Sequence, residues 1–227
     1  MRILLSFLLF CPLLGAASYR TNFPAAENPI SQGNIWRNGA ADGIDWCNVQ
    51  TSPGLAWGVG PCPTEYADPT AILKGTWGPD QTLRAKAHVT SPNPKYYQEI
   101  ELRLRTTVKA HSITGYEINI GVSHAYVQIV RWNGPLADFT YLGSTCTYPA
   151  VCGQVNGYTI SNGDVAVATI KGNKIDVYVN GKLIATVTDS TYSTGNPGIG
   201  FNFGCGGTYS DFGWSSFEAT DGPALKQ

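Results

Sequence analysis

The sequence predicts an all-β protein built as a sandwich of two sheets. Short runs in which apolar and polar residues alternate recur along the chain, and Gly, Pro, Asn and Asp separate them at regular intervals. No segment longer than a turn or two repeats its apolar positions every 3.6 residues, so almost no helix is expected beyond the amino-terminal leader. Many short strands of this kind typically form a sandwich, because each strand has one apolar face to bury.

The chain begins with a pattern typical of a secretory signal peptide. Arg2 is followed by an apolar run over residues 3–14 and by the small residues 15–18. The apolar run is too short to cross a bilayer as a helix. We therefore expect residues 1–18 to be a signal peptide, residues 19–227 to form a single β-sandwich domain, and the protein to be secreted into an extracellular or periplasmic space.

The composition narrows the class of partner. Charged residues make up 14% of the chain, aromatic residues 11%, and the formal net charge is −1. Nucleic acids and anionic membranes both favour basic proteins, so neither is expected as a partner. No later stretch is apolar enough for membrane insertion. An uncharged partner such as a glycan fits this composition, and the oligomeric state stays open.

Five cysteines follow the leader, and export permits disulfides between them. Proximity along the chain favours the pairs Cys47–Cys62 and Cys146–Cys152, although the sequence leaves other pairings open. Cys205 is then left over, either as a buried thiol or as a replacement partner. No cysteine pair has the spacing of a zinc site.

Several short strands are expected before residue 90. Residues 35–37, 44–46 and 55–57 are brief β candidates in a region rich in Trp, Gly, Asn and Pro. Residues 81–90 then alternate between small or apolar residues and Arg, Lys and His. That alternation predicts a strand with one face toward the core.

Three consecutive strands are predicted over residues 96–105, 115–120 and 125–132. In the first of them, Ile100 and Leu104 share one face of the extended chain. The opposite face carries aromatic and charged side chains: Tyr97, Glu99, Glu101, Arg103 and Arg105. If the three strands are neighbours in one sheet, their polar faces form a patch. This patch is the main candidate for the functional site.

The strongest local signal is a β-hairpin. Asn180-Gly181 separates two β-rich runs, residues 174–179 and 182–187, and this dipeptide favours a type I′ turn because both positions need positive φ. Pairing outward from the turn sets Val177 beside Ile184. One core face is then expected to hold Ile175, Val177, Val179 and Ile184.

The remaining segments complete the predicted sandwich. A long loop is expected over residues 133–152, and strands are expected over residues 165–170, 199–203 and 212–219. The last of these should pair near the first strand and close the domain.

The later half of the chain resembles the concanavalin A-like, or laminin G-like, jelly-roll superfamily. The resemblance is carried by residues 172–183 (GNKIDVYVNGKL), by residues 195–201 (GNPGIGF) and by Gly115-Tyr116-Glu117-Ile118, and it covers roughly residues 99–227. It implies a two-sheet antiparallel jelly-roll sandwich. Members include lectins, glycan-binding modules, glycoside hydrolases and polysaccharide lyases, so the resemblance implies carbohydrate as partner without deciding between binding and cleavage.

Two catalytic patterns of that superfamily are incomplete here. The Glu-x-Asp-x-x-Glu motif of laminarinase-type hydrolases is absent. Glu101-Leu102-Arg103-Leu104-Arg105 keeps only part of the Arg-x-Glu-x-Arg strand of alginate-lyase-type members, and Gln128-Ile129-Val130 lacks the histidine of their Gln-x-His strand. These departures weaken the lyase interpretation.

Glu99 and Glu101 are the candidate catalytic carboxylates. Residues two apart on one strand face lie roughly 6.5–7 Å apart, and two nearby carboxylates can divide into a general acid and a nucleophile or base for glycoside cleavage. His124 is the histidine best placed to act as a base. The alternative is that the carboxylates and the arginines of this strand form a solvated ladder of ion pairs.

Aromatic and polar side chains of the same strands are the candidate ligand contacts, since sugar rings stack on flat aromatic faces. The predicted substrate-binding set is Tyr97, Arg103, Arg105, Tyr126, Gln128 and Trp132. By strand parity Tyr126, Gln128 and Trp132 share a face, whereas Glu117 and Asn119 lie opposite Tyr116, so the two sets should not line one groove without a bulge. The alternative for the tyrosines is packing alone.

Structural calcium is the one cofactor that the sequence suggests. Asp42, Asp45, Asp68 and Asp80 lie in predicted loops and could supply oxygen ligands, although loop aspartates also cap turns.

The leading hypothesis is a secreted carbohydrate-binding jelly-roll domain that recognises a polysaccharide through a polar, aromatic sheet face. A polysaccharide-cleaving enzyme with Glu99 or Glu101 as catalytic carboxylate is the first alternative, and a self-associating adhesion or matrix protein is the second.

Overall fold

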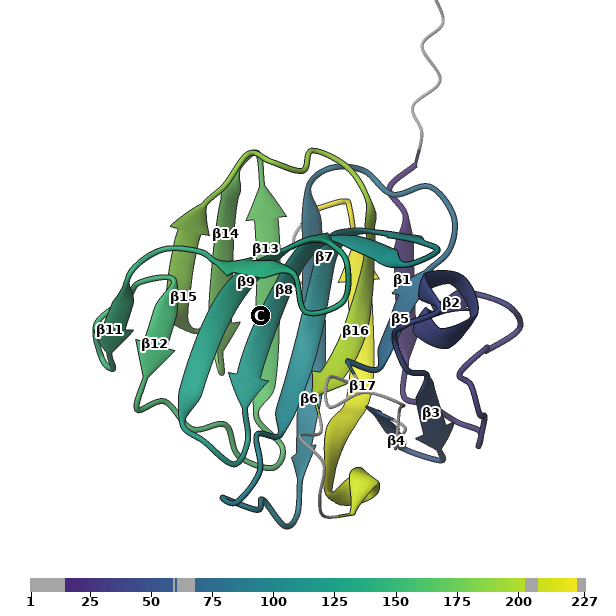
Figure 1. The fold of residues 1–227 in the computed structure, drawn as a ribbon, viewed down its shortest axis with the longest axis horizontal. Coiled ribbons are helices and arrows are strands. Elements are labelled where there is room, and N and C mark those ends of the chain that lie inside the picture. Colours follow the sequence, from purple (N-terminus) through teal and green to yellow (C-terminus); the bar gives the residue numbers. More distant parts are fainter. Residues whose placement is uncertain (1–14, 59, 61–67, 203–207, 224–227) are drawn as a thin grey trace, which may run out of the picture.

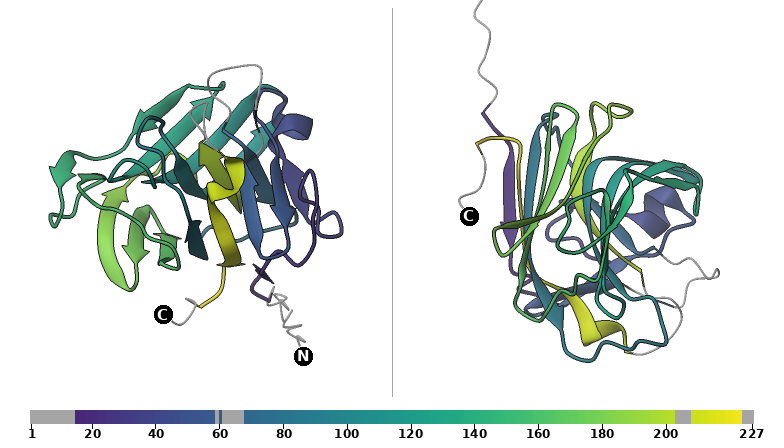
Figure 2. Two further views of the ribbon diagram at one scale, coloured as in Figure 1. Left: turned by 90° about the horizontal axis from the view of Figure 1, so that it is seen from below. Right: turned by 90° about the vertical axis from the view of Figure 1, so that its left-hand side faces the viewer.

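The computed structural model describes residues 15–58, 60, 68–202 and 208–223. Two sheets stack face to face, as the edge-on view in Figure 2 shows. Nearly all pairings are antiparallel, and the exception among the named strands is the short parallel pair β11–β12. The predicted all-β sandwich is therefore confirmed (Figure 1).

The back sheet has eight strands in the order β15-β14-β13-β6-β17-β4-β3, with β1 paired to β17. Its strands are β1 (Ser18–Thr21), β3 (Val49–Ser52), β4 (Leu55–Gly58), β6 (Gln81–Val89), β13 (Val165–Lys171), β14 (Lys174–Val179), β15 (Lys182–Thr188) and β17 (Phe212–Thr220). The pairing of β17 with both β6 and β1 confirms that the last strand closes the domain near the first.

The front sheet has nine strands in the order β11-β12-β9-β8-β7-β16-β5-β2, with β10 paired to β9. Its strands are β2 (Trp36–Asn38), β5 (Thr70–Leu73), β7 (Glu99–Lys109), β8 (Ser112–Gly121), β9 (Tyr126–Gly134), β10 (Phe139–Tyr141), β11 (Thr145–Thr147), β12 (Gln154–Asn156) and β16 (Asn196–Asn202). The expected long loop over residues 133–152 is therefore wrong, because β10 and β11 form within it.

The main core lies between the two sheets. Ile100, Leu102 and Leu104 of β7 are fully buried there, together with Leu83 and Phe217 of the back sheet. Because side chains alternate along a strand, this packing sends the intervening polar residues of β7 to the outer face of the front sheet. The apolar alternation therefore decides where the polar patch lies.

Among the described residues, helix is limited to a π-helical turn at Gly39–Gly43 and a 3₁₀ turn at Tyr209–Asp211. The strand predicted over residues 44–46 is wrong, because the chain bends there after the π-helical turn. The bend buries Trp46, whose ring lies 5.7 Å from that of Trp132. None of the described helices combines the length and apolarity needed to cross a membrane.

The predicted hairpin forms with one change of register. Asn180 and Gly181 have φ of 49° and 78°, as a type I′ turn requires. A bulge between Val177 and Tyr178 pairs Val177 with Ala185 rather than with Ile184. The predicted core face survives, since the expected set is buried: Ile175, Val177, Val179 and Ile184.

The Cys146–Cys152 disulfide is confirmed and joins the region of β11 to the segment before β12. Cys47 is also disulfide-bonded, and its partner lies outside the described residues, as do Cys62 and Cys205. Residues 1–14 lie outside them too, so the signal peptide stays a prediction.

Candidate functional site

The polar residues of three adjacent front-sheet strands lie side by side on its outer face. The register pairs Glu101 of β7 with Asn119 of β8, and Asn119 with Gln128 of β9. Arg103 pairs with Glu117 in the same way. Directly paired residues project from the same face of a sheet, so these side chains form one continuous polar surface.

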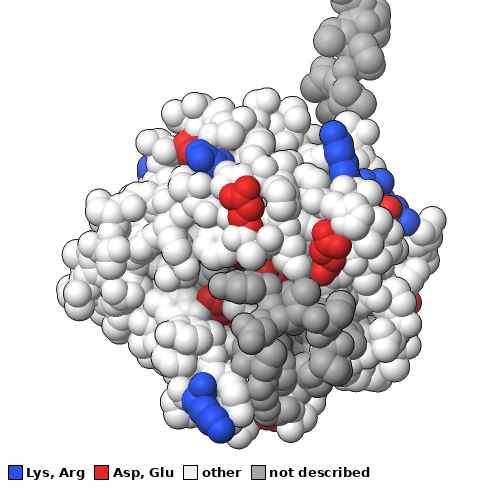
Figure 3. All heavy atoms as spheres, in the orientation of Figure 1, with Lys and Arg blue, Asp and Glu red and all other residues white. Residues whose placement is uncertain are grey.

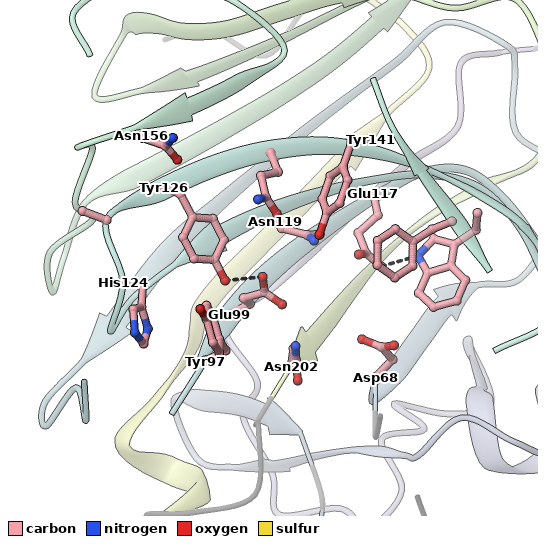
Figure 4. Close-up of a pocket in the computed structure, with 14 residues that line it drawn as sticks. Asp68, Tyr97, Glu99, Glu117, Asn119, His124, Tyr126, Tyr141, Asn156 and Asn202 are labelled. Atoms are coloured by element: carbon pink, nitrogen blue, oxygen red, sulfur yellow. Dashed lines mark hydrogen bonds between the residues drawn. The ribbon is translucent and has the colours of Figure 1, made fainter. Parts of the chain in front are cut away.

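A pocket of about 910 Å³ opens over this surface. Figure 4 shows the side chains that line it, and Figure 3 shows acidic atoms in and around the hollow on this face. The described lining consists of Asp68, Tyr97, Glu99, Glu117, Asn119, His124, Ala125, Tyr126, Gln128, Trp132, Phe139, Tyr141, Asn156 and Asn202. Aromatic rings and hydrogen-bonding groups therefore meet in one concave site.

Glu99 lies at the centre of the pocket (Figure 4). Its carboxylate is 6% exposed and accepts hydrogen bonds from the Tyr126 hydroxyl and the Asn202 side chain. Burial raises the pKa of Glu99 to about 7, and the two hydrogen bonds oppose that rise. Near neutral pH this carboxyl is therefore close to the midpoint of its titration.

A glycine creates the space for the Tyr126 ring. Gly121 pairs with Glu99 across the sheet, and a Cβ at this position would come within 2.7 Å of the Tyr126 ring. The ring therefore lies over Gly121 and brings its hydroxyl to Glu99. Burial, followed by the charge of Glu99, raises the pKa of Tyr126, so this hydroxyl stays protonated and donates.

Tyr97 and His124 form the rim near Glu99. Their rings stack with centroids 4.3 Å apart and planes 13° apart, and Tyr97 is 59% exposed. His124 Nδ1 lies 3.2 Å from Ser123 Oγ. The stack holds a flat aromatic face at the mouth of the pocket.

A buried ion cluster forms the floor beside the pocket. The Arg103 guanidinium is 1% exposed and contacts Glu101 at 2.8 Å and also Glu117. Trp132 Nε1 donates to Glu117 at 2.8 Å, and the guanidinium lies 5.6 Å from the Trp132 ring centroid. Gly200 of β16 leaves room for the pair, since its Cβ would lie 2.2 Å from Glu101 Oε2.

Acidic groups outnumber cations at this site. Burial, followed by the charge of Glu117, raises the pKa of both Asp68 and Glu101 well above its usual range. Arg103 opposes both rises, but one guanidinium cannot neutralise four neighbouring carboxyls. Asp68 and Glu101 therefore retain protons at pH values where exposed carboxyls are ionised.

A second apolar cluster covers the front sheet at the Trp132 end of the pocket. It consists of Trp46, Ile72, Val108, Ile113, Val130 and Trp132, with Leu136 and Phe139 packed against it. This cluster fixes Trp132 so that its indole N–H reaches Glu117.

The structure brings together most of the predicted site residues, although their role in binding or catalysis stays a prediction. Six of them line the pocket: Tyr97, Glu99, His124, Tyr126, Gln128 and Trp132. Glu101 and Arg103 lie in the buried cluster rather than in the described lining. The alternative of a solvated ion-pair ladder is wrong about solvation: Arg103 pairs with Glu101 and with Glu117 of the neighbouring strand, but these side chains are buried.

Arg105 points away from the pocket. It has a φ of 46°, next to a register shift between Leu104 and Thr107. Its guanidinium donates to the carbonyl oxygens of Pro79, Tyr192 and Gly172. These contacts hold the Arg105 side chain away from the Glu99 end of β7, where the pocket lies.

The expected split of the pocket by strand parity is wrong. Glu117 and Asn119 line the same pocket as Gln128 and Trp132, and the β8–β9 pairing has no register shift. Tyr116 lies on the opposite face of β8, where it is part of the main core.

Asp68, which the sequence suggested only as a calcium ligand, lines the pocket, as does Asn202, which the sequence assigned to no site. Asn202 alternates with Phe201 in a predicted strand, so parity already indicated a polar outer position for it. Asp68 precedes β5, whose place next to β16 no local pattern reveals.

The calcium candidates do not fit one ion. Asp42 pairs with Arg37, Asp45 with His111, and Asp80 with Arg105. No group of three His, Cys, Asp or Glu suited to a metal occurs among the described residues. We therefore derive no function through calcium.

Comparison with known proteins identifies structural neighbours. No family model and no curated protein matches the chain. A carbohydrate-binding module, CBM66 from Bacillus subtilis, is 13% identical with a TM-score of 0.54 and covers 86% of this chain and 97% of its own. The exoplasmic/lumenal domain of VIP36, in a Ca²⁺/Man-bound form, is 10% identical with a TM-score of 0.57 and covers 92% and 93%.

A third neighbour is a native glycosidic hydrolase, 14% identical with a TM-score of 0.53, covering 89% of this chain and 94% of its own. Identities this low show the fold alone. Together with the two-sheet architecture, these neighbours confirm the predicted fold, a two-sheet antiparallel jelly-roll sandwich.

Proposed function

We propose that the protein binds a polysaccharide in the front-sheet pocket. The observation that carries the proposal is the combination of aromatic faces at the pocket wall with carboxylate and amide groups across its floor. Sugars present both C–H faces that stack on aromatic rings and hydroxyl groups that need hydrogen-bond partners.

The neighbouring folds support this proposal by analogy. One is described as a carbohydrate-binding module and another was captured in a Ca²⁺/Man-bound form. Fold alone does not decide function, so the pocket residues carry the argument. Export through the predicted signal peptide would place such a protein among extracellular glycans.

Tyr97 offers the cleanest test of binding. A glycan array first identifies the ligand, and titration calorimetry then compares the wild type with Tyr97→Ala. Because Tyr97 is 59% exposed, its truncation should leave the fold intact while removing a stacking face. We expect affinity to fall about tenfold, or roughly 1.4 kcal/mol.

Tyr178→Ala serves as the matched control, since Tyr178 is a partly buried tyrosine of the back sheet. It should bind the glycan as the wild type does. Equal affinities of wild type and Tyr97→Ala would contradict binding at this pocket.

The second candidate function is cleavage of the bound glycan, which the position and proton affinity of Glu99 favour. A carboxyl with a pKa of about 7 can protonate a leaving glycosidic oxygen at neutral pH. The second carboxylate would be Asp68 or Glu117, because both line the pocket. Glu101 is less suited than predicted, since it is fully buried and lies outside the described pocket lining.

Glu99→Gln separates binding from cleavage. If Glu99 is the acid, this variant should retain glycan affinity and lose the release of reducing ends or unsaturated products. A wild type that binds but releases no product would leave binding as the function. Unchanged turnover by Glu99→Gln would rule out Glu99 as the acid.

A further inference from the structure

The charge of the described pocket lining is one-sided. Three carboxyl side chains line it, those of Asp68, Glu99 and Glu117, whereas its described residues include no Lys or Arg. On this face the lysine and arginine atoms lie around the periphery, as Figure 3 shows. Within the described lining, a ligand therefore meets carboxyl groups and no guanidinium or ammonium group.

Arg103, the nearest guanidinium, is not free to receive an anionic ligand. Its Nη2 already contacts both Glu101 and Glu117, and the side chain is 1% exposed. Its Nε has no hydrogen-bond partner among the described residues, but it faces β16, where a Cβ on Gly200 would lie 2.6 Å away. Turning toward the pocket would leave two buried carboxylates without their cation, which is costly.

The pocket also contains an acceptor without a partner. Asn119 is 7% exposed and lines the pocket, and its Oδ1 has no hydrogen-bond partner among the described residues. Figure 4 shows Asn119 among the side chains that line the pocket. A buried carbonyl oxygen without a partner costs free energy, so a ligand that donates a hydrogen bond to it would be favoured.

We propose that the pocket takes glycan units bearing hydroxyl or amino groups and rejects units bearing carboxylate or sulfate. This inference rests on the proposed function and names its ligand class. Hydroxyl and amino groups can donate to the carboxyl oxygens of the lining and to Asn119 Oδ1. An anionic unit would bring its charge into a pocket that already holds three carboxyls, with no free guanidinium or ammonium in the described lining to pair with it.

Affinities for oligosaccharides of matched length and linkage test this ligand class. The probes are oligoglucose, oligoglucosamine and oligoglucuronate, together with an array of neutral, amino, uronate and sulfated glycans. We expect binding among the neutral or amino glycans and at least about tenfold weaker binding of their acidic counterparts. An acidic glycan bound as tightly as its neutral counterpart would overturn the inference. If the protein bound none of the glycans, the proposed function would be overturned, and this inference with it.

Gln128→Lys provides a gain-of-function test. Gln128 is a partly exposed lining residue, so a lysine there adds the missing cation without disturbing the core. The ratio of uronate to neutral affinity should rise about tenfold. Glu218→Gln makes the same change in net charge on the back sheet, where Glu218 pairs with the exposed Arg20, and should leave the ratio unchanged. A ratio that stays at the wild-type value in Gln128→Lys would contradict the inference.

Discussion

Replacing Arg103 tests the view that the floor of the pocket is a buried ion cluster. Arg103→Met keeps much of the side-chain volume but leaves Glu101 and Glu117 without their cation. Removing one partner of a buried ion pair costs about 3–5 kcal/mol. We expect the free energy of unfolding, measured by urea denaturation at pH 8, to fall by about that amount.

The loss should depend on pH in a defined direction. Burial already raises the folded-state pKa of Glu101 above its unfolded value, and removing Arg103 removes a charge that opposes this rise. Stability then decreases as pH rises between the unfolded and folded pKa values, because the folded state holds more protons. The loss in Arg103→Met should therefore be smaller at pH 5 than at pH 8.

Arg20→Met is the matched control for this experiment. Arg20 also pairs with a glutamate, Glu218, at 3.6 Å, but its side chain is 83% exposed. An exposed pair of this kind contributes about 0–1 kcal/mol. Equal effects of the two substitutions, or a loss in Arg103→Met that does not change with pH, would refute the buried cluster.

Two further predictions concern the same site. Tyr126→Phe removes a hydrogen bond that lowers the pKa of Glu99. A ¹³C NMR titration of the variant should therefore give Glu99 a pKa above its wild-type value of about 7. An unchanged or lower pKa would contradict the contact between Tyr126 and Glu99. Gly200→Ala places a Cβ 2.2 Å from Glu101 Oε2. The free energy of unfolding, measured by urea denaturation, should therefore fall by about 1–3 kcal/mol. An unchanged free energy of unfolding would show that the strands are less closely packed.

Local patterns predicted much of the fold. Apolar alternation in residues 100–104 identified the core face of β7, because each strand must bury one side. Asn180-Gly181 identified its hairpin, because its backbone geometry suits few other residues. The bulge beside Val177 could not be predicted in the same way, because it depends on packing across the sandwich.

The candidate site was only partly predictable, for two physical reasons. The alternation of side chains along a strand identified Tyr97, Glu99 and Trp132 as outward-facing site residues, since side-chain direction follows from sequence position within a strand. It could not find Asp68, because the neighbour of β5 in the sheet comes from a distant part of the chain. Nor could it foresee that Arg103 is buried, since charged residues on a sheet face are usually solvated.

The most direct test of the central claim is to follow the indole N–H signals of the tryptophans by NMR while the glycan is added. Trp132 lines the pocket and donates to Glu117, whereas Trp77 donates to the carbonyl oxygen of Lys74. If the glycan occupies the pocket, the Trp132 signal should shift in a saturable manner and the Trp77 signal should stay in place. Saturable glycan binding that leaves the Trp132 signal unmoved would contradict the account.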